Sequence, residues 1–264
     1  MLIIHLIILA IVQGLTEFIP VSSSAHLILA PVILGWEDQG TAIDIAAHIG
    51  SLGAVLIYFR QETAMLFRGG IDTLAFKQSD DRKLFLFLAV GTIPLVLTGV
   101  VLALTGASDV LRDPKIIAAA SIIFGIVLYI ADRRPTENEK LPSTWKSVMT
   151  IGVAQAIATI PGTSRSGITI TAARWLGFTR EAAARFSMLM AIPAIIASGA
   201  YIGVDFVKEG GTAELMPMFV VALFSFVAAY LAIVLFLRFA QKISFTPFVI
   251  YRIVLGLLIF TMLS

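Results

Sequence analysis

The sequence of 264 residues contains no cysteine and few charged residues. The absence of cysteine excludes disulfide bonds, thiolate metal sites and cysteine nucleophiles. The three histidines, His5, His26 and His48, are too few and too scattered for a histidine metal cluster. Charged residues make up 14% of the chain and hydrophobic residues 58%, whereas a soluble domain has roughly 25% charged residues. The composition therefore excludes a soluble domain and indicates a polytopic membrane protein.

Basic residues are also absent from the first 59 positions. A signal peptide begins with positive charge, so we expect the apolar start of this chain to remain in the mature protein. Elsewhere, the net charge of +2 and the pI near 9.0 come from short basic groups dispersed between apolar runs. This dispersal indicates topology signals, and we expect no nucleic-acid partner.

Six apolar stretches approach the roughly 20 residues that a helix needs to cross a bilayer. We predict six transmembrane helices, at about residues 43–59, 84–104, 115–131, 184–203, 216–237 and 247–263. Two further apolar regions, 2–34 and 147–178, are each interrupted near the middle by a proline with small polar residues. Because proline, glycine and consecutive hydroxyl residues continue a helix poorly, we predict that each region forms a helix, a loop and a second helix.

The basic residues between the predicted spans set the orientation of the chain. Three connections hold most of them: Arg60, Arg68, Lys77, Arg82 and Lys83; Arg133, Arg134, Lys140 and Lys146; Arg238 and Lys242. Cytoplasmic loops carry the excess of Lys and Arg, so these connections are expected inside and the segment 35–42 outside. Under these constraints 147–178 leaves and returns to the cytoplasmic side, and 2–34 enters from and returns to the outside. Both pairs are then re-entrant.

This topology predicts two inverted repeats within one integral membrane domain that covers residues 1–264. Each repeat, about 1–131 and 147–264, has one re-entrant pair and three spans. Three crossings bring the chain to the opposite side of the membrane, so the second repeat begins with the opposite orientation. Sparse matches after a shift of 141 or 142 residues support the repeat: Pro20 with Pro161, Ser23 with Ser164, and Gln13 with Gln155. Inverted repeats with broken helices place polar sites near the membrane midplane, so we expect the two loops to face each other.

Two isolated charges lie in the interrupted regions. Glu17 is the only formally charged residue before Glu37, and Arg165 is the only one between Lys146 and Arg174. An ionisable side chain inside a membrane is costly and therefore indicates a functional site. The alternative is a structural ion pair between Glu17 and Arg165 that holds the two halves together.

Hydroxyl residues at both predicted helix starts favour the functional reading. Ser22, Ser23 and Ser24 are expected as the cap and first turn of one helix, and the other start carries Gly162, Ser164, Ser166 and Thr169. Backbone N–H groups, hydroxyls and a guanidinium together predict a site for phosphate or diphosphate. His26 lies within reach of the same ligand and is a candidate general acid or base. His48 is a weaker candidate for the same cavity.

Two motifs carry a family resemblance. The sequences QGLTEFIPVSSSAH at 13–26 and PGTSRSG at 161–167 resemble the signature motifs of the bacterial undecaprenyl-diphosphate phosphatase family, also called bacitracin-resistance proteins. A lesser match, PFVIYR at 247–252, extends the resemblance over nearly the whole chain. The resemblance implies removal of the terminal phosphate from a prenyl diphosphate lipid at the outer face of the bacterial cytoplasmic membrane. It also implies a divalent cation, Mg²⁺ or Ca²⁺, and an assembly for which a homodimer is one option.

Phosphoryl transfer needs neutralised phosphate oxygens, an in-line nucleophile and a stabilised leaving group, and our hypothesis distributes these roles over the site residues. Arg165, with Ser164, Ser166 and Thr169, would hold the diphosphate. Glu17 and Gln13 would hold the metal or orient a water, although Gln13 stands where the commonest family pattern has glutamate. Ser23 is the candidate nucleophile with His26 as base or acid, and direct attack by water is the alternative. Since broken helices in inverted repeats are typical of transporters, the rival function is a carrier or flippase of a phosphorylated prenyl lipid.

Overall fold

The computed structural model describes residues 2–37, 39–208 and 214–262, and their regular secondary structure is entirely helical. The helices are α1 (Ile3–Phe18), α2 (Ser23–Leu34), α3 (Thr41–Tyr58), α4 (Arg60–Leu74), α5 (Asp80–Thr105), α6 (Ala107–Leu111), α7 (Pro114–Asp132), α8 (Trp145–Ala156), the 3₁₀ turn η1 (Ile157–Thr159), α9 (Arg165–Trp175), α10 (Arg180–Lys208), α11 (Leu215–Ala240) and α12 (Thr246–Met262). The predicted all-α fold is confirmed, and no strand occurs in the described ranges.

Within the described residues, five helices are long and apolar enough to cross a membrane: α3, α5, α7, α10 and α11. Their bounds lie within about five residues of the predicted spans, because uninterrupted apolar runs determine both. The sixth predicted span, 247–263, corresponds to α12, which has 17 residues and is one residue shorter than α3, the shortest of the five. Residue 263 lies outside the described part of the chain.

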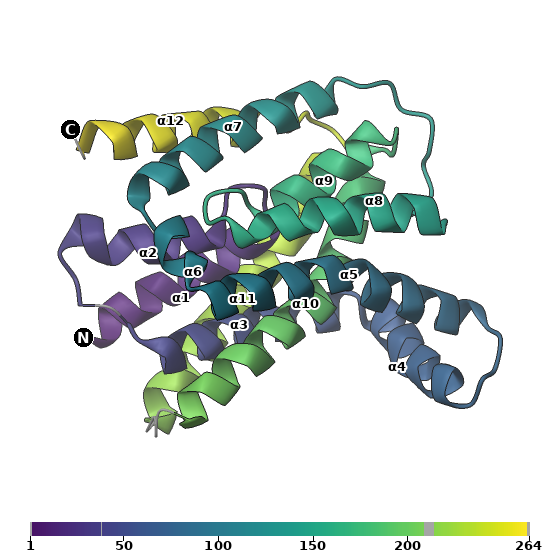
Figure 1. Cartoon of the computed structure of the whole chain (residues 1–264), viewed down its shortest axis with the longest axis horizontal. Helices are drawn as coiled ribbons and strands as arrows, with labels where there is room; N and C mark the ends of the chain where they lie inside the picture. The colour runs from purple at the N-terminus through teal and green to yellow at the C-terminus, as the bar shows by residue number, and fades with distance from the viewer. Residues whose placement is uncertain (1, 38, 209–213, 263–264) are drawn as a thin grey trace.

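Helix α4 was not anticipated, because its charged residues were assigned to a cytoplasmic loop. It begins directly after α3 and packs against α5 (Figure 1). An ion pair joins the two helices, with 2.6 Å between Arg68 Nε and Asp81 Oδ2. The Ser79 hydroxyl caps α5 by accepting a hydrogen bond from the Arg82 N–H at 3.0 Å. The basic connection after α3 therefore forms a helical hairpin of α4 and the start of α5.

Both interrupted regions form the predicted helix, loop and helix. Residues 19–22, the first loop, separate α1 from α2, and residues 160–164, the second loop, separate η1 from α9. Within each region the chain reverses, and both loops lie toward the middle of the molecule (Figure 1). The Ser166 hydroxyl donates to the Ile19 carbonyl oxygen at 2.8 Å, so the two loops meet as expected.

Close helix contacts fix the position of both loops. A Cβ atom at Gly14 in α1 would overlap the backbone of Ser225 in α11, and one at Gly152 in α8 would overlap the backbone of Gly91 in α5. Small residues at membrane helix interfaces permit such approach of two backbones. Each helix that leads into a loop is therefore held directly against a long helix of the other half.

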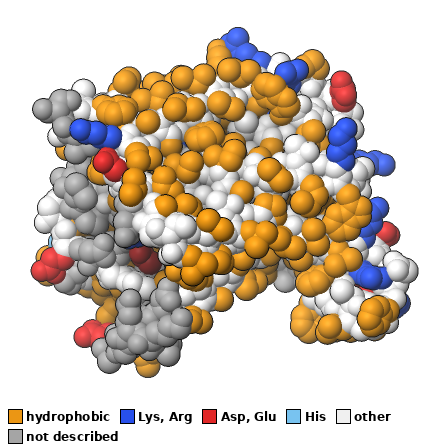
Figure 2. Space-filling view, viewed as in Figure 1, with side chains coloured by type: hydrophobic (Ala, Val, Ile, Leu, Met, Phe, Trp, Pro, Cys, Tyr) orange, Lys and Arg blue, Asp and Glu red, His pale blue; other side chains and the backbone are white. Residues whose placement is uncertain are grey.

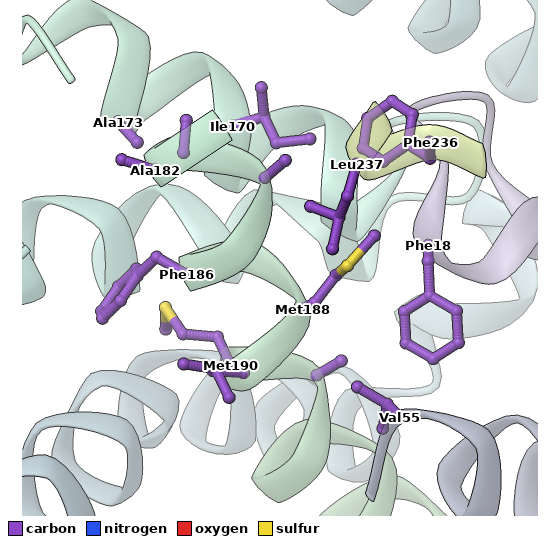
Figure 3. Close-up of a cluster of buried hydrophobic side chains, with 14 of the residues drawn as sticks. Phe18, Val55, Ile170, Ala173, Ala182, Phe186, Met188, Met190, Phe236 and Leu237 are labelled. Carbon is purple, nitrogen blue, oxygen red and sulfur yellow. The ribbon is translucent and has the colours of Figure 1, made fainter. Parts of the chain in front are cut away.

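Helix α10 runs through the largest cluster of buried apolar side chains. Phe186, Met188 and Met190 of this helix lie in the same cluster as Phe18 of α1 and Val55 of α3 (Figure 3). All five side chains are at most 3% exposed. Because Phe18 immediately precedes the first loop, packing in this cluster fixes the loop relative to α10.

The outer surface is largely apolar. Leu97, Leu235 and Leu257 are exposed by 60%, 62% and 54%, and Figure 2 shows hydrophobic side chains across the middle of one face. Most Lys and Arg side chains in this view lie along its right and upper edges, near α4, the end of α7 and the start of α8 (Figures 1 and 2). An apolar belt with basic side chains concentrated toward one end is typical of a protein surrounded by lipid.

Candidate active site

Ser22 and Ser164 begin α2 and α9 in the same unusual backbone conformation. Their φ angles are +77° and +70°, in the left-handed region that most residues avoid. Each hydroxyl accepts a hydrogen bond from the N–H three residues ahead, that of Ala25 at 3.4 Å and that of Gly167 at 3.0 Å. The counterpart of Ser164 is therefore Ser22. The backbone conformation and the cap thus relate Ser164 to Ser22, and the sequence match of Ser164 with Ser23 is wrong at this point.

Because Ser22 is the cap, the hydroxyl of Ser23 is directed to another partner. Its Oγ donates to Glu17 Oε2 at 2.7 Å. The same carboxylate oxygen accepts from Gln13 Nε2 at 2.9 Å, and Glu17 Oε1 lies 3.2 Å from Arg165 Nη2. The Glu17 and Arg165 side chains are only 7% and 13% exposed. The two isolated charges of the sequence thus form an ion pair, and Ser23 is bonded to its acidic member.

Arg165 is held from two further directions. Its Nη2 donates to the Glu17 carbonyl oxygen at 3.3 Å, and its Nη1 donates to the Ser187 carbonyl oxygen in α10 at 3.1 Å. The Thr169 hydroxyl donates to Ser187 Oγ at 2.7 Å. Thr169 and Ser166 are both buried and are bonded within the protein. These two residues, together with Gly162, lie behind the site and support its loops.

A cavity of about 370 Å³ opens beside the ion pair. Its polar end is lined by Glu17, Ser22, Ser23, Ser24, His48, Ser164 and Arg165. Its apolar wall comes from α5 and α10 and includes Leu95, Val96, Val100, Ala194, Ile195 and Ala197. A polar end with hydroxyls, helix starts and a guanidinium, together with an apolar wall, suits a ligand with an anionic head and a hydrocarbon tail.

The two candidate histidines occupy different places. His48 lines the cavity, and its Nδ1 donates to the Asp44 carbonyl oxygen at 2.7 Å. His26 is not among the cavity residues: its Nδ1 donates to the Ser22 carbonyl oxygen at 2.7 Å, and its Nε2 lies 2.5 Å from the Tyr251 hydroxyl. The His26 and Tyr251 rings are also stacked, with centroids 5.7 Å apart. The weaker sequence candidate, His48, is therefore the one that faces the cavity.

A divalent cation would find oxygen ligands beside Glu17. The Gln13 side chain is fully buried, and its Oε1 has no hydrogen-bond partner in the described structure. Carboxylate and amide oxygens are the ligands that Mg²⁺ and Ca²⁺ accept. No group of three or more His, Cys, Asp or Glu side chains with metal-binding geometry occurs in residues 2–37, 39–208 and 214–262. Gln13 and Glu17 are therefore the candidate oxygen ligands, although it is Gln13 Nε2 that faces Glu17, and a cation would need most of its oxygens from a ligand or water.

Sequence reasoning missed Arg252, which is fully buried and contacts both loops. It lies in the predicted span 247–263, where it is the one charged residue. A single charge in an apolar run is the same signal that identified Glu17 and Arg165. Applied to every span, that rule would have found Arg252.

Comparison with known proteins places the chain in a family. The model of the bacitracin resistance protein BacA family matches residues 6–258. The protein named undecaprenyl-diphosphatase from Jannaschia sp. (strain CCS1) is 47% identical over 262 residues, which cover 96% of each chain. The protein of the same name from Nitrosococcus oceani is 47% identical, and the match covers 99% of each chain. The one from Teredinibacter turnerae is 44% identical, and the match covers 97% of this chain and 98% of the relative. These matches confirm the resemblance of the two motifs, and this multi-pass membrane protein belongs to the bacitracin resistance protein BacA family.

Proposed function

We propose that this chain is an undecaprenyl-diphosphatase, a hydrolase that converts undecaprenyl diphosphate to undecaprenyl phosphate and inorganic phosphate. The observation that carries the proposal is the convergence of Glu17, Ser23 and Arg165 at the polar end of a cavity with an apolar wall. This activity returns the lipid carrier to cell-wall synthesis and thereby confers resistance to bacitracin.

Phosphate recognition rests on the two helix starts. The N-termini of α2 and α9 meet at the loops, with the Ser22, Ser24 and Ser164 side chains at the cavity surface. Backbone N–H groups at a helix start favour an anion, and the Arg165 guanidinium adds positive charge and the N–H groups that are not bonded to Glu17 and Ser187. We assign these groups to the diphosphate, with Ser166, Thr169 and Gly162 supporting the loops from behind.

The hydrogen bond from Ser23 to Glu17 supports Ser23 as the nucleophile. In the proposed step, Ser23 Oγ attacks the terminal phosphorus while its proton moves to Glu17 Oε2, 2.7 Å away. The bond between that phosphorus and the bridging oxygen breaks, and undecaprenyl phosphate leaves. Water then attacks the phosphoserine, releases inorganic phosphate and restores the Ser23 hydroxyl. A base bonded directly to the nucleophile is the usual arrangement for covalent catalysis.

Glu17 is better placed than His26 to take this proton. Both ring nitrogens of His26 are engaged, with the Ser22 carbonyl and the Tyr251 hydroxyl. We therefore assign to His26 the positioning of the Ser22 backbone at the start of α2. His48, which lines the cavity, is the second titratable group that can carry a proton for the leaving group.

Gln13 and Glu17 are the residues that would hold a divalent cation, through the unpartnered Gln13 Oε1 and the Glu17 carboxylate. When bound, the cation neutralises charge on the nonbridging phosphate oxygens. Because a single carboxylate serves it, most of its remaining ligands would come from the substrate and water.

The prenyl chain lies against α5 and α10. The apolar wall extends from Leu95 and Ile195 to Gly99 and Tyr201, toward the ends of these helices. Both helices begin beside the basic residues that we assign to the cytoplasm. The cavity residues lie in their later parts, so the site belongs to the outer half of the bacterial cytoplasmic membrane.

With the basic connections on the cytoplasmic side, the chain crosses the membrane six times, and α12 is the sixth crossing. The two inverted repeats then each begin with a re-entrant pair. The matching caps at Ser22 and Ser164 support this symmetry. Both helix starts then approach the midplane from opposite sides, which is where inverted-repeat proteins bind their ligands.

Phosphate release from C55 and C15 prenyl diphosphates by purified protein in detergent tests this function. We expect release that depends on a divalent cation and stops with chelator. A carrier would instead move labelled lipid phosphate between leaflets and release no phosphate. That result would support the rival function and contradict the phosphatase.

A further inference from the structure

Arg252 is a fully buried arginine whose guanidinium ties the two loops together. Its Nη2 donates to the carbonyl oxygens of Gly162 and Thr163 in the second loop, at 2.9 and 2.8 Å. Its Nη1 donates to the carbonyl oxygen of Pro20 in the first loop at 3.4 Å. Its Nε donates to the carbonyl oxygen of Ser121 in α7 at 3.2 Å. One side chain therefore joins three segments that are distant in sequence.

The start of α9 is built to accommodate this guanidinium. A Cβ atom at Gly167 would lie 2.7 Å from Arg252 Nη1 and 3.1 Å from Ser164 Oγ. Arg252 thus packs directly behind the turn that presents Ser164 to the cavity. Any shift of the guanidinium would move the carbonyl groups of the second loop and, with them, the N–H groups that face the ligand.

The positive charge of Arg252 has no acidic partner. None of the salt bridges within the described ranges includes it, and each of its bonds goes to a backbone carbonyl. The other fully buried arginine, Arg174, differs, because its Nε lies 3.4 Å from Asp132 Oδ1. Arg165 is likewise paired, with Glu17. The two loops therefore share one uncompensated positive charge.

We infer that Arg252 is a positioning residue for phosphate transfer, which holds both loops in register and supplies the charge that the substrate anion compensates. This inference rests on the proposed function. Backbone carbonyls stabilise a buried guanidinium but leave its charge in place, and a buried charge without a counter-ion is unfavourable. The entry of a diphosphate beside Ser164 removes that unfavourable state. Arg252 thus contributes to substrate affinity without touching the substrate.

Two variants separate the effect of the Arg252 charge from the effect of its several hydrogen-bond donors. Arg252→Lys keeps the charge and loses the planar guanidinium, whereas Arg252→Met loses both at similar length. Arg174→Lys is the matched control, because Arg174 is equally buried and also donates to backbone carbonyls, but lies with Asp132 away from the cavity. For each protein we would measure the melting temperature, kcat and KM for a C15 diphosphate, and Ki for inorganic pyrophosphate.

For Arg252→Met we expect kcat/KM to fall by at least about 10²-fold, with Ki for pyrophosphate raised about tenfold by the lost charge. Arg252→Lys should keep Ki within about threefold while kcat falls about tenfold, because lysine cannot bind all three segments. Arg174→Lys should lower the melting temperature and leave kcat, KM and Ki near the original values. If Arg252→Lys gave only this control pattern, Arg252 would be structural alone. Should the unmodified protein release no phosphate, the proposed function fails, whereas the dissociation constants of pyrophosphate, measured by direct binding to the same variants, still test Arg252.

Discussion

Replacement of Glu17 by glutamine removes the one carboxylate at the polar end of the cavity. Glutamine has the same size, but it keeps only one of the two oxygens that accept from Gln13 Nε2 and Arg165 Nη2, at 2.9 and 3.2 Å. Two things change. The proton acceptor 2.7 Å from Ser23 Oγ becomes a neutral amide, and Arg165 loses its ion-pair partner.

These two changes act on different kinetic constants, and their effects on kcat/KM are opposite. Loss of a general base lowers the rate of the chemical step by about 10²- to 10⁴-fold. An unpaired Arg165 attracts the diphosphate more strongly, because a unit charge about 4 Å away contributes roughly 4 kcal/mol at an effective dielectric constant near 20. We therefore predict that Glu17→Gln lowers kcat by at least about 10²-fold and leaves KM unchanged or lower.

The exchange variant Gln13→Glu with Glu17→Gln is the matched control. It restores the negative charge one helical turn earlier, away from the hydrogen bond between Ser23 and position 17. Phosphate release with a C15 diphosphate at saturating Mg²⁺ gives kcat and KM for all three proteins. We expect the exchange variant to remain slow. Full recovery by the exchange, or a kcat for Glu17→Gln within about threefold of the original, would refute the assignment of Glu17 as the base.

Three further predictions follow from the same geometry. Arg165→Lys keeps the charge but loses the planar guanidinium that bonds to both Glu17 and α10. We expect kcat/KM to fall at least about tenfold. Normal turnover would exclude bidentate phosphate binding by Arg165. Gly99→Trp should fill open space at the apolar wall, so that KM for a C55 diphosphate rises while Ki for inorganic pyrophosphate stays constant. An equal loss of affinity for both ligands would contradict a prenyl subsite there. In this cysteine-free chain, a cysteine at position 39 should react with an impermeant reagent on intact cells and one at position 78 only after lysis, and the reverse pattern would invert the topology.

The elements that depend on local sequence were predicted well. Apolar runs gave the long helices because each run had to be buried in lipid or protein, whatever its neighbours. Pro20 and Pro161 located the loops because each has consecutive hydroxyl or glycine residues beside it, whereas Pro94 and Pro193, which lack such runs, lie inside α5 and α10. Glu17 and Arg165 were found by their isolation, and their contact follows from the facing loops.

The features that depend on tertiary contacts were not predicted. The direction of His26 is set by Tyr251, a residue 225 positions away, and the position of His48 by the packing of α3 beside α10. The pairing of Ser22 with Ser164 follows from backbone angles, and a one-residue shift hides it in the sequence. Helix α4 was overlooked because its charges resemble those of a loop, whereas its packing on α5 decides its structure.

The rate of the Ser23→Ala enzyme tests the central claim, that Ser23 attacks phosphorus with Glu17 as its base, most directly. In single turnovers of a prenyl diphosphate labelled at the terminal phosphate, we predict a loss of more than about 10⁴-fold for Ser23→Ala. The unmodified enzyme should carry the label on Ser23 after rapid quenching. Removal of a single hydrogen-bond donor costs about 10²- to 10³-fold. A residual rate in that range, with no label on Ser23 in the unmodified enzyme, would contradict the claim and assign the attack to water.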